Sequence, residues 1–300
     1  MRKRLLFVYN SFAGKSMIKG VLAEIINIFT KAGYDVTAYP TQCAQDAEKK
    51  VRDEHAEYDL VVCSGGDGTL DEVVSGMMSS GFVTPLGYIP AGSTNDFANS
   101  LRLPKSMTRA AHSIVEGKRY ACDVGSFNRD FFIYIAAFGL FTEISYETKQ
   151  EVKNVLGHMA YLLEGVKKLS NIRTYNLKIE GDNFATEGEF IYGMITNSTS
   201  VGGFQKITGK NVKLNDGLFE VTLIKPPKSP LELQKILSAL LGADMNMEYM
   251  YCFKTSHLEI TCRDEVAWTL DGEFGGRHKK VVIDNNKRAV ELIVPQKKTP

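Results

Sequence analysis

The first third of the chain alternates short apolar runs with longer segments in which apolar residues recur at the spacing of a helix. The apolar runs predict strands at residues 5–9, 34–39, 58–63 and 86–89. The helical spacing predicts helices over residues 17–32, 42–55 and 69–79. Gly33 closes the first of these helices, Thr41 caps the second, and a further helix is expected from Ser106 to Gly117. Strands that alternate with helices are typical of a parallel sheet covered by helices.

After about residue 122, strands follow one another through turns that contain Gly, Asn or Asp. We expect strands at residues 131–138, 173–180, 184–196, 218–224, 256–262, 280–283 and 290–294. Helices are predicted at residues 147–170 and 231–241, the second with Ser229 as its N-cap and Pro230 in its first turn. This part of the chain is therefore expected to be an antiparallel β domain. Its apolar run 131–141 is most simply a buried strand, with the lining of an acyl-chain pocket as the alternative.

Length and composition agree with two folded domains. At 300 residues the chain has room for two domains, each with a sizeable core. Hydrophobic residues make up 44% of the chain and charged residues 24%, which argues against disorder and against an integral membrane protein. We expect an α/β protein in which residues 1–123 form a parallel-sheet domain and residues 124–300 an antiparallel β-sandwich. The last strand is a candidate to pack back on the first domain.

Charge and cysteine usage limit the partners and the location. The 36 Lys and Arg residues and the 35 Asp and Glu residues leave a net charge of +1, so no global basic field is available for nucleic acid. No apolar stretch approaches the roughly 20 residues of a transmembrane helix, and the first residues lack a signal-peptide core. Five cysteines without a CxxC pair predict reduced thiols. We therefore expect a cytoplasmic protein.

A glycine-rich loop follows the predicted strand 58–63 and directly precedes a helix, with the sequence Ser64-Gly65-Gly66-Asp67-Gly68-Thr69. The glycines let backbone N–H groups approach an anion, and the helix N-terminus adds its positive dipole end. Because Asp67 would repel a bare phosphate, we expect it to act through Mg²⁺, directly or by water. The alternative is a tight strand-to-helix turn with an aspartate cap.

Two further loops are expected at the same sheet edge, since ligands bind outside the carboxyl ends of parallel strands. The strand at residues 86–89 is followed by Pro90-Ala91-Gly92-Ser93-Thr94-Asn95-Asp96, which offers donors and a second carboxylate, or simply a helix cap at Thr94. The first loop of the chain contains Gly14-Lys15-Ser16. It is not a P-loop, because that motif needs glycine at position 9, where this chain has tyrosine. It suits nucleotide phosphates or serves as an N-terminal cap.

The segments GGDGTLDEVVSG and PAGSTNDFA resemble the catalytic domain of the diacylglycerol kinase family, in particular its soluble bacterial lipid kinases. The resemblance extends over nearly the whole chain, because later motifs of the family fall in order. It implies an α/β nucleotide-binding domain similar to those of NAD kinases and phosphofructokinases, followed by a β-sandwich domain, with the active site in the cleft between them. This agrees with the two halves predicted from the residue pattern.

The resemblance also implies roles for individual residues. Asp67 and Asp96 would organise a catalytic Mg²⁺ through water, and Glu273, in the motif Asp271-Gly272-Glu273, would be the general base. The contacts to ATP that it implies are Asn10, Ser11, Phe12, Ala13, Gly14, Thr41, Gly65, Gly66, Asp67, Gly68, Thr69 and Thr94.

The resemblance further implies a structural Mg²⁺ held by Asp216 and by the carbonyl groups of Lys213 and Leu218. Taken by itself, this segment is more simply a hairpin turn. The chain departs from the family pattern at two positions, where Ser11 stands in place of proline and Asp71 in place of asparagine. Asp71 adds a negative charge one helical turn after Asp67, which either tightens the water network of the metal or favours the helix N-terminus.

We therefore expect an ATP- and Mg²⁺-dependent lipid kinase that converts diacylglycerol to phosphatidic acid. The alternatives are a kinase for phosphatidylglycerol, a sphingoid base or NAD, and a non-catalytic regulator that binds nucleotide. A lipid substrate requires peripheral contact with a membrane surface, so a transiently membrane-associated protein is expected, and the family makes a homodimer an expectation.

Overall fold

The computed structural model describes residues 2–81, 84–92, 94–140, 142, 172–202, 204–205, 208, 211–240 and 248–296. The chain forms two compact units. Unit 1 comprises Met1–Val124 and Lys287–Pro300, and unit 2 comprises Gly125–Asn286. The chain enters unit 2 within strand β5 (Lys118–Phe127) and returns to unit 1 within strand β16 (Glu273–Val294).

Unit 1 is built on a parallel sheet. Its strands pair in the order β4–β3–β1–β2, and the last residues of β16 add a further parallel strand, in which Leu292 lies opposite Leu86 of β4. These strands are β1 (Lys3–Tyr9), β2 (Tyr34–Pro40), β3 (Leu60–Gly65) and β4 (Leu86–Pro90). β3 and β4 are buried along their whole length, as is typical of central strands covered on both faces.

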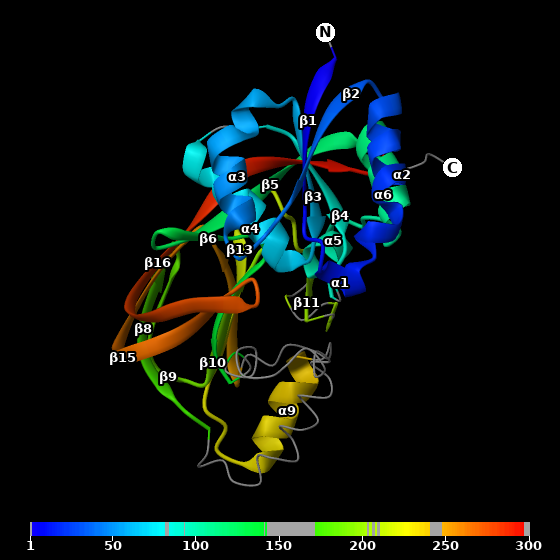
Figure 1. Cartoon of the computed structure of the whole chain (residues 1–300). Helices are drawn as coiled ribbons and strands as arrows, with labels where there is room; N and C mark the ends of the chain where they lie inside the picture. Colours follow the sequence, from blue (N-terminus) through cyan, green and yellow to red (C-terminus); the bar gives the residue numbers. More distant parts are fainter. Residues whose placement is uncertain are drawn as a thin grey trace. The chain divides into compact units, whose positions relative to one another are not determined.

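Helices cover both faces of this sheet. α2 and α6 lie together on one side, and α3 and α4 lie together on the other (Figure 1). The apolar stripe of α2 buries Ile25 and Phe29, which join Phe7 of β1 and Ile114 of α6 in one core cluster. The helices are α1 (Ala13–Ser16), α2 (Ile18–Lys31), α3 (Asp46–Glu54), the 3₁₀ turn η1 (His55–Glu57), α4 (Asp67–Ser80), α5 (Asp96–Ser100) and α6 (Met107–Glu116).

The predicted strands and helices of unit 1 are present, and two helix starts are corrected. The helix expected from residue 42 begins at Asp46, so Thr41 is not its N-cap. Gln45 takes that position in the left-handed conformation, with φ 65°. The helix expected from residue 69 begins at Asp67, because β3 ends at Gly65 and leaves Gly66 as the cap.

Unit 2 is antiparallel. Pairing runs in the order β14–β13–β10–β7–β15–β16, β8 and β9 form a hairpin on β15, and β6 pairs with β5. Its helix α9 spans Pro230–Leu240, and the backbone N–H of Glu232 donates to the Ser229 hydroxyl, which confirms the predicted cap. The remaining strands are β6 (Asp130–Phe132), β7 (Ile135–Gly139), β8 (Tyr175–Gly181), β9 (Phe184–Phe190), β10 (Tyr192–Thr196), β11 (Ser200–Val201), β12 (Phe204–Gln205), β13 (Phe219–Ile224), β14 (Met250–Thr255) and β15 (His257–Leu270).

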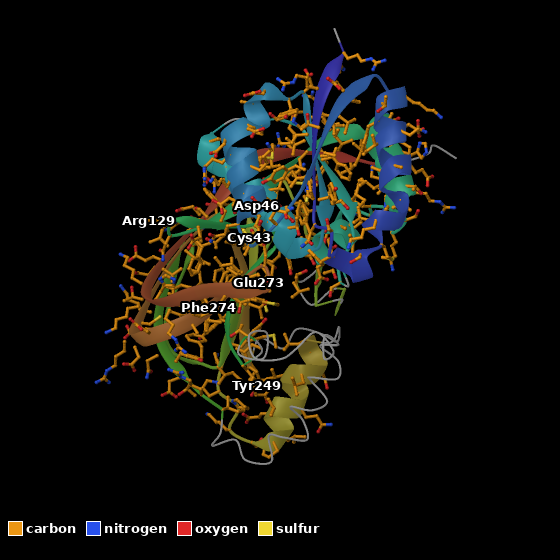
Figure 2. All side chains as sticks on the ribbon, in the orientation of Figure 1. Cys43, Asp46, Arg129, Tyr249, Glu273 and Phe274 are labelled. Atoms are coloured by element: carbon orange, nitrogen blue, oxygen red, sulfur yellow. The ribbon has the colours of Figure 1, made fainter. Side chains whose placement is uncertain are left out.

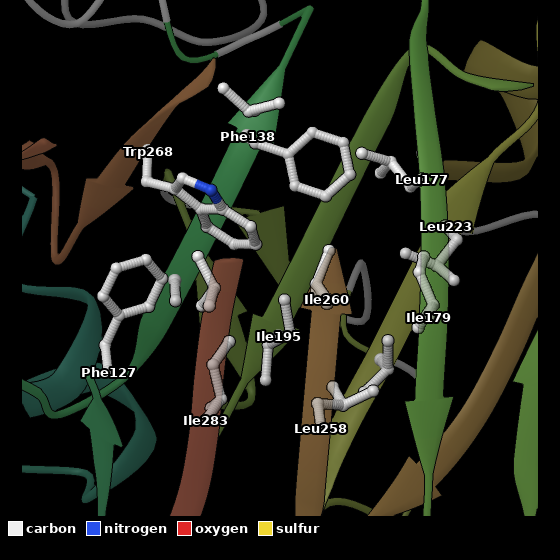
Figure 3. Packing of buried hydrophobic residues seen from close by; sticks show 14 of the residues in the cluster. Phe127, Phe138, Leu177, Ile179, Ile195, Leu223, Leu258, Ile260, Trp268 and Ile283 are labelled. Atoms are coloured by element: carbon white, nitrogen blue, oxygen red, sulfur yellow. The ribbon is translucent and has the colours of Figure 1, made fainter. Parts of the chain in front are cut away.

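The long strand β15 organises the core of unit 2. Its first half pairs with β8 and its second half with β7, and its register with β16 shifts between these halves. Trp268, in the second half, is fully buried and packs against Phe127 and Phe138, with ring centroids 5.0 and 4.9 Å apart (Figure 3). Aromatic pairs at this separation add to the stabilisation from burial alone.

Some strands of unit 2 differ from the prediction. The run expected as one strand at residues 131–138 is split between β6 and β7, and the run 184–196 between β9 and β10. The strands expected at 280–283 and 290–294 are parts of the single strand β16. The predicted helix 147–170 lies outside the described residues. Within the described part of the chain, every helix is too short or too polar to cross a membrane.

Candidate active site

Three loops of unit 1 leave the same edge of its sheet. Because β1, β3 and β4 are parallel, the loops that begin at Asn10, Gly66 and Ala91 start side by side. Backbone hydrogen bonds tie them together: the Asn10 N–H donates to the Ser64 carbonyl at 2.9 Å, and the Ala91 N–H donates to the Gly65 carbonyl at 2.8 Å. The sheet therefore fixes the starts of the three loops next to one another.

The Asn10 side chain connects the first loop to the second. Its Oδ1 accepts the backbone N–H of Phe12 at 2.9 Å, and its Nδ2 lies 3.5 Å from the Thr69 hydroxyl on α4. The Phe12 ring projects into solvent with 76% of its surface exposed, and the Lys19 ammonium lies 5.2 Å from its centre. The Asn10 side chain thus holds the first loop in place and links it to the start of α4.

Glycine is required where these loops touch. A β-carbon on Gly14 would collide with the carbonyl oxygen of Ala91, and φ at Gly14 is +54°. A β-carbon on Gly92 would lie 2.8 Å from the Gly66 Cα. A β-carbon on Gly65 would collide with the side chain of Thr69. The glycines of the three loops therefore permit their close approach to one another and leave the backbone open to a ligand.

Asn95 shapes the third loop, which runs from β4 to α5. It adopts the left-handed conformation with φ 51°, its Oδ1 accepts the Gly92 N–H at 2.9 Å, and its Nδ2 donates to the Gly92 carbonyl at 2.7 Å. The Thr94 carbonyl accepts a hydrogen bond from the Asn99 side chain. Ser93 lies outside the described residues. Asp96 follows as the first residue of α5 and is 98% buried, since its relative exposure is 2%.

Tyr88 is a site residue that the sequence pattern did not identify. Its hydroxyl donates to the Gly65 carbonyl at 3.2 Å and lies 3.4 Å from Asn95 Oδ1, so it joins the second loop to the third. Burial, and then the negative charge of Asp67, raise the pKa of Tyr88 well above its usual value. The only feature of the sequence that could have identified Tyr88 is that it carries the one hydroxyl in the otherwise apolar predicted strand 86–89.

The acidic residues of the second loop stand at the start of α4. Asp67 is its first residue, Gly66 caps it, and Asp71 follows one turn later, a placement that the helix dipole favours. One carboxylate oxygen of each aspartate is shielded from solvent, and the buried Ser64 hydroxyl has no hydrogen-bond partner among the described residues. Carboxylate oxygens beside glycine N–H groups are suited to Mg²⁺ and a phosphate chain, so these residues fit a metal-bound nucleotide.

Two residues in the remainder of the GGDGTLDEVVSG segment hold α3 against α4. The Glu72 carboxylate accepts the backbone N–H groups of Gln45 and Ala47, at 2.9 and 3.2 Å, which satisfies the start of α3. Burial raises the pKa of Glu72, although these two hydrogen bonds act in the opposite direction. One turn later, a β-carbon on Gly76 would lie 2.5 Å from the Glu48 carbonyl. The sequence motif thus positions the loop before α3 as well as the glycine loop.

In unit 2, Glu273 is the first residue of β16. The turn before it consists of Asp271 and Gly272, with φ 49° and 90°, and joins Leu270 of β15 to Glu273. Two successive positive φ angles are typical of the tight type I′ hairpin turn. The Glu273 side chain is exposed, as is that of Phe274 beside it (Figure 2). The Glu273 carboxylate therefore stands exposed directly after a tight turn.

The segment predicted to hold a structural Mg²⁺ also lies in unit 2. The Leu218 N–H donates to Asp216 Oδ1 at 3.2 Å, and Lys213 is exposed. The Lys254 ammonium lies 3.8 Å from Asp216 Oδ2 and 2.7 Å from the Glu220 carboxylate. The oxygen donors of this turn suit Mg²⁺, which would share Asp216 with the lysine. No cluster of three His, Cys, Asp or Glu side chains fit to hold a metal occurs in the described part of the chain.

The predicted site residues therefore fall into two groups, one at the carboxyl edge of the unit 1 sheet and one in unit 2. Thr41 joins the first group because it follows β2, and its N–H donates to the Tyr9 carbonyl at 3.0 Å. Glu273 and the segment 213–218 belong to unit 2. The predicted residues at the carboxyl edge of the unit 1 sheet are Asn10, Ser11, Phe12, Ala13, Gly14, Thr41, Gly65, Gly66, Asp67, Gly68, Thr69, Thr94 and Asp96.

Comparison with known proteins covers both units. Residues 4–127 match the model of the diacylglycerol kinase catalytic domain, and residues 141–294 match the YegS C-terminal NAD kinase beta sandwich-like domain. A diacylglycerol kinase of Bacillus subtilis (strain 168) is 33% identical over 298 residues, covering 99% of this chain and 98% of that protein. A diacylglycerol kinase of Staphylococcus carnosus (strain TM300) is 34% identical over 299 residues, covering 99% and 96%.

Solved structures share the fold. A crystal structure of a diacylglycerol kinase from Bacillus anthracis str. Sterne, 23% identical, superposes with a TM-score of 0.77 over 98% of this chain and 97% of that chain. A second crystal structure from the same organism, 25% identical, has a TM-score of 0.84 and covers 98% and 95%. The predicted fold class, a parallel-sheet α/β unit followed by an antiparallel β-sandwich, is confirmed.

Proposed function

Because the chain belongs to the diacylglycerol kinase family, we propose that it is an ATP- and Mg²⁺-dependent lipid kinase that phosphorylates the free hydroxyl of diacylglycerol to give phosphatidic acid. The observation that carries the proposal is the set of three interlocked glycine-bearing loops at one sheet edge, with Asp67 and Asp96 at their helix starts. The relatives named diacylglycerol kinase match along nearly their whole length, which supports the lipid substrate.

In this proposal the loops bind ATP. Backbone N–H groups of the glycine loops and the start of α4 hold the phosphates, and the half-buried loop from Asn10 to Gly14, in which Phe12 is exposed, borders the nucleotide. Asp67 and Asp96 would hold Mg²⁺ through water, and the ion would neutralise phosphate charge. Phosphoryl transfer depends chiefly on such positioning and charge stabilisation.

Glu273 is the proposed general base. Its carboxylate accepts the proton of the lipid hydroxyl as the hydroxyl oxygen forms a bond to the γ-phosphorus of ATP. The bond from that phosphorus to the bridging oxygen breaks, and ADP leaves with the bonding electrons. A general base contributes about 10²- to 10⁴-fold to a rate, so Glu273→Gln should lower kcat by that order and leave ATP binding intact.

We also propose that Asp216 and the carbonyl groups of Lys213 and Leu218 hold a structural Mg²⁺. The Asp216 carboxylate already accepts a hydrogen bond from the Leu218 N–H in the same loop, and this bond preorganises the segment. Since its proposed substrate resides in a bilayer, the enzyme would work at a membrane surface through peripheral contact.

Transfer of radiolabel from ATP tests the function. The acceptors should be diacylglycerol, phosphatidylglycerol and a sphingoid base in detergent micelles, with NAD in solution. We expect label in phosphatidic acid, a loss in Glu273→Gln, and a larger loss in Asp67→Asn because metal and phosphate placement both suffer. Preferred labelling of NAD would replace the lipid assignment. Tight ATP binding without transfer to any acceptor would indicate a nucleotide-binding regulator.

A further inference from the structure

Asp271 is a buried carboxylate at the turn that leads to Glu273. It is 4% exposed although it occupies the tip of the β15–β16 hairpin, where aspartate is ordinarily solvated. Its Oδ2 accepts the backbone N–H of Ile133 at 2.6 Å, and its Oδ1 accepts those of Tyr134 at 3.0 Å and Ile135 at 2.9 Å. Three N–H groups of a separate segment thus converge on one carboxylate.

The backbone of this turn is held by the same segment. The Asp271 N–H donates to the Ile135 carbonyl at 2.9 Å, and the Tyr134 hydroxyl donates to the Asp271 carbonyl at 3.3 Å. Hydrogen bonds to an ionised acceptor are roughly twice as strong as neutral ones. The tip of the hairpin is therefore anchored to the link between β6 and β7, within unit 2, and cannot swing as a free hairpin tip would.

We propose that Asp271 is a positioning residue for Glu273. The inference rests on the proposed function, in which Glu273 is the general base. Glu273 is separated from Asp271 only by Gly272, and its own side chain is exposed, so no burial holds it in place. The orientation of its backbone depends on the turn, and the turn depends on the Asp271 carboxylate. The carboxylate of Asp271 accepts three backbone N–H groups of residues 133–135, so the role proposed for it is to hold the turn.

The chain provides a control in Asp182, an exposed aspartate at the turn between β8 and β9. Its Oδ2 accepts the Ser256 N–H at 2.6 Å, the Ser256 hydroxyl at 2.8 Å and the Thr255 hydroxyl at 3.1 Å. Asp182 therefore anchors a hairpin turn of the same unit through a comparable set of donors, without a candidate catalytic residue beside it. Loss of either carboxylate should lower the stability of the protein, but only the loss of the Asp271 carboxylate should lower the rate of the reaction.

The first experiment compares Asp271→Asn with Asp182→Asn in the full-length enzyme. Asparagine keeps the size of the side chain and tolerates positive φ, but its amide nitrogen cannot accept an N–H. For Asp271→Asn we expect kcat on diacylglycerol to fall by about 10- to 100-fold while KM for ATP stays within about threefold. Asp182→Asn should keep kcat within about twofold. Equal effects of both variants on kcat would overturn the inference.

A double-mutant cycle separates positioning from a general loss of structure. If Asp271 acts through Glu273, Asp271→Asn should lower kcat in the wild-type background and have no further effect in Glu273→Gln. Additive losses would overturn the positioning role. Full activity of Glu273→Gln would instead remove the proposed base and so the premise.

A milder variant keeps the inference testable when Asp271→Asn does not fold. Tyr134→Phe removes only the hydroxyl that reaches the Asp271 carbonyl. It should lower kcat about two- to fivefold, with an unchanged KM for ATP, and it should have no effect in Glu273→Gln. An unchanged kcat in a folded Tyr134→Phe variant, together with a failure of Asp271→Asn to fold, would assign Asp271 a purely structural role.

Discussion

Adding one methyl group at Gly92 tests whether the three loops at the sheet edge of unit 1 must touch in order to bind ATP as proposed. Gly92 belongs to the third loop and faces Gly66 of the second. In Gly92→Ala the new β-carbon would lie 2.8 Å from the Gly66 Cα and 2.7 Å from Asn95 Oδ1. One of these neighbours is backbone, and the other is the side-chain atom that accepts the Gly92 N–H, so neither can move without breaking a contact.

The magnitude follows from these distances. Carbon atoms in ordinary contact stand about 3.5 to 4.0 Å apart, so the loops must separate by roughly 0.7 to 1.2 Å. Overpacking of this kind costs about 1 to 3 kcal/mol of folding stability. A displacement of about 1 Å at a site that positions a reacting group costs about 10²-fold in rate. Because the loops hold ATP in the proposed function, the loss should appear in kcat/KM for ATP.

Gly20→Ala is the matched control. Gly20 lies in α2 of the same unit, and its added β-carbon would meet nothing within 4 Å. Gly20 lies in the first turn of α2, where alanine is favoured over glycine by at most about 1 kcal/mol, so this variant should be no less stable than the wild type and have unchanged kinetics. Steady-state kinetics over a range of ATP concentrations, with urea unfolding of the same samples, measure both effects.

The reasoning would be refuted by a Gly92→Ala enzyme that keeps wild-type kcat/KM for ATP at unchanged stability. That result would mean that the third loop can shift without disturbing the bound nucleotide. A loss of stability alone, without a kinetic change, would show that the close approach serves folding and not ATP binding.

Three further predictions concern single side chains. Tyr88→Phe should lower the free energy of unfolding in urea by only about 0.5 to 1 kcal/mol, because the Gly65 carbonyl keeps its hydrogen bond from Ala91; a loss above about 3 kcal/mol would contradict this. Burial raises the pKa of Glu220 to about 7 from 4.5, even with Lys254 beside it, so the folded state binds the extra proton and stability should fall as the pH rises from about 4.5 to 7. Relative to Glu220→Gln, the wild type should lose about 1 to 3 kcal/mol over this range, and parallel pH curves for the two proteins would disprove it. Mg²⁺ at a hundredfold excess over its Kd should stabilise the wild type by about 2.7 kcal/mol without nucleotide, and Asp216→Asn should abolish the shift in Tm; equal shifts in both proteins would exclude Asp216.

The local features of the candidate site were predictable because they depend on residues close together in the chain. The glycines around Asp67 identify a strand-to-helix turn with open backbone, whatever packs against it. The end of helix α6 at Gly117 and the cap of α9 at Ser229 were predictable for the same reason, since a cap involves residues within one turn.

Interactions that join distant segments escaped the sequence pattern. The start of α3 depends on Glu72, whose carboxylate comes from α4 and meets Gln45 across 27 positions of sequence. Residues 42–45 fit a helical pattern by themselves, but they fold as a loop because that carboxylate caps the helix at Asp46. Tyr88 likewise looked like any aromatic residue of a buried strand until Gly65 and Asn95 were placed beside its hydroxyl.

The sequence by itself determined the periodicity of the strands and helices, and the glycine positions in the loops that follow the strands of unit 1. These follow from conformational preferences that each short segment expresses alone. Only the tertiary structure decided that β15 pairs with β8 in its first half and β7 in its second, and that Asp271 finds its donors at residues 133–135. Such pairings are selected by the burial of Trp268 and its neighbours in one core, a property of the assembled unit and not of any segment within it.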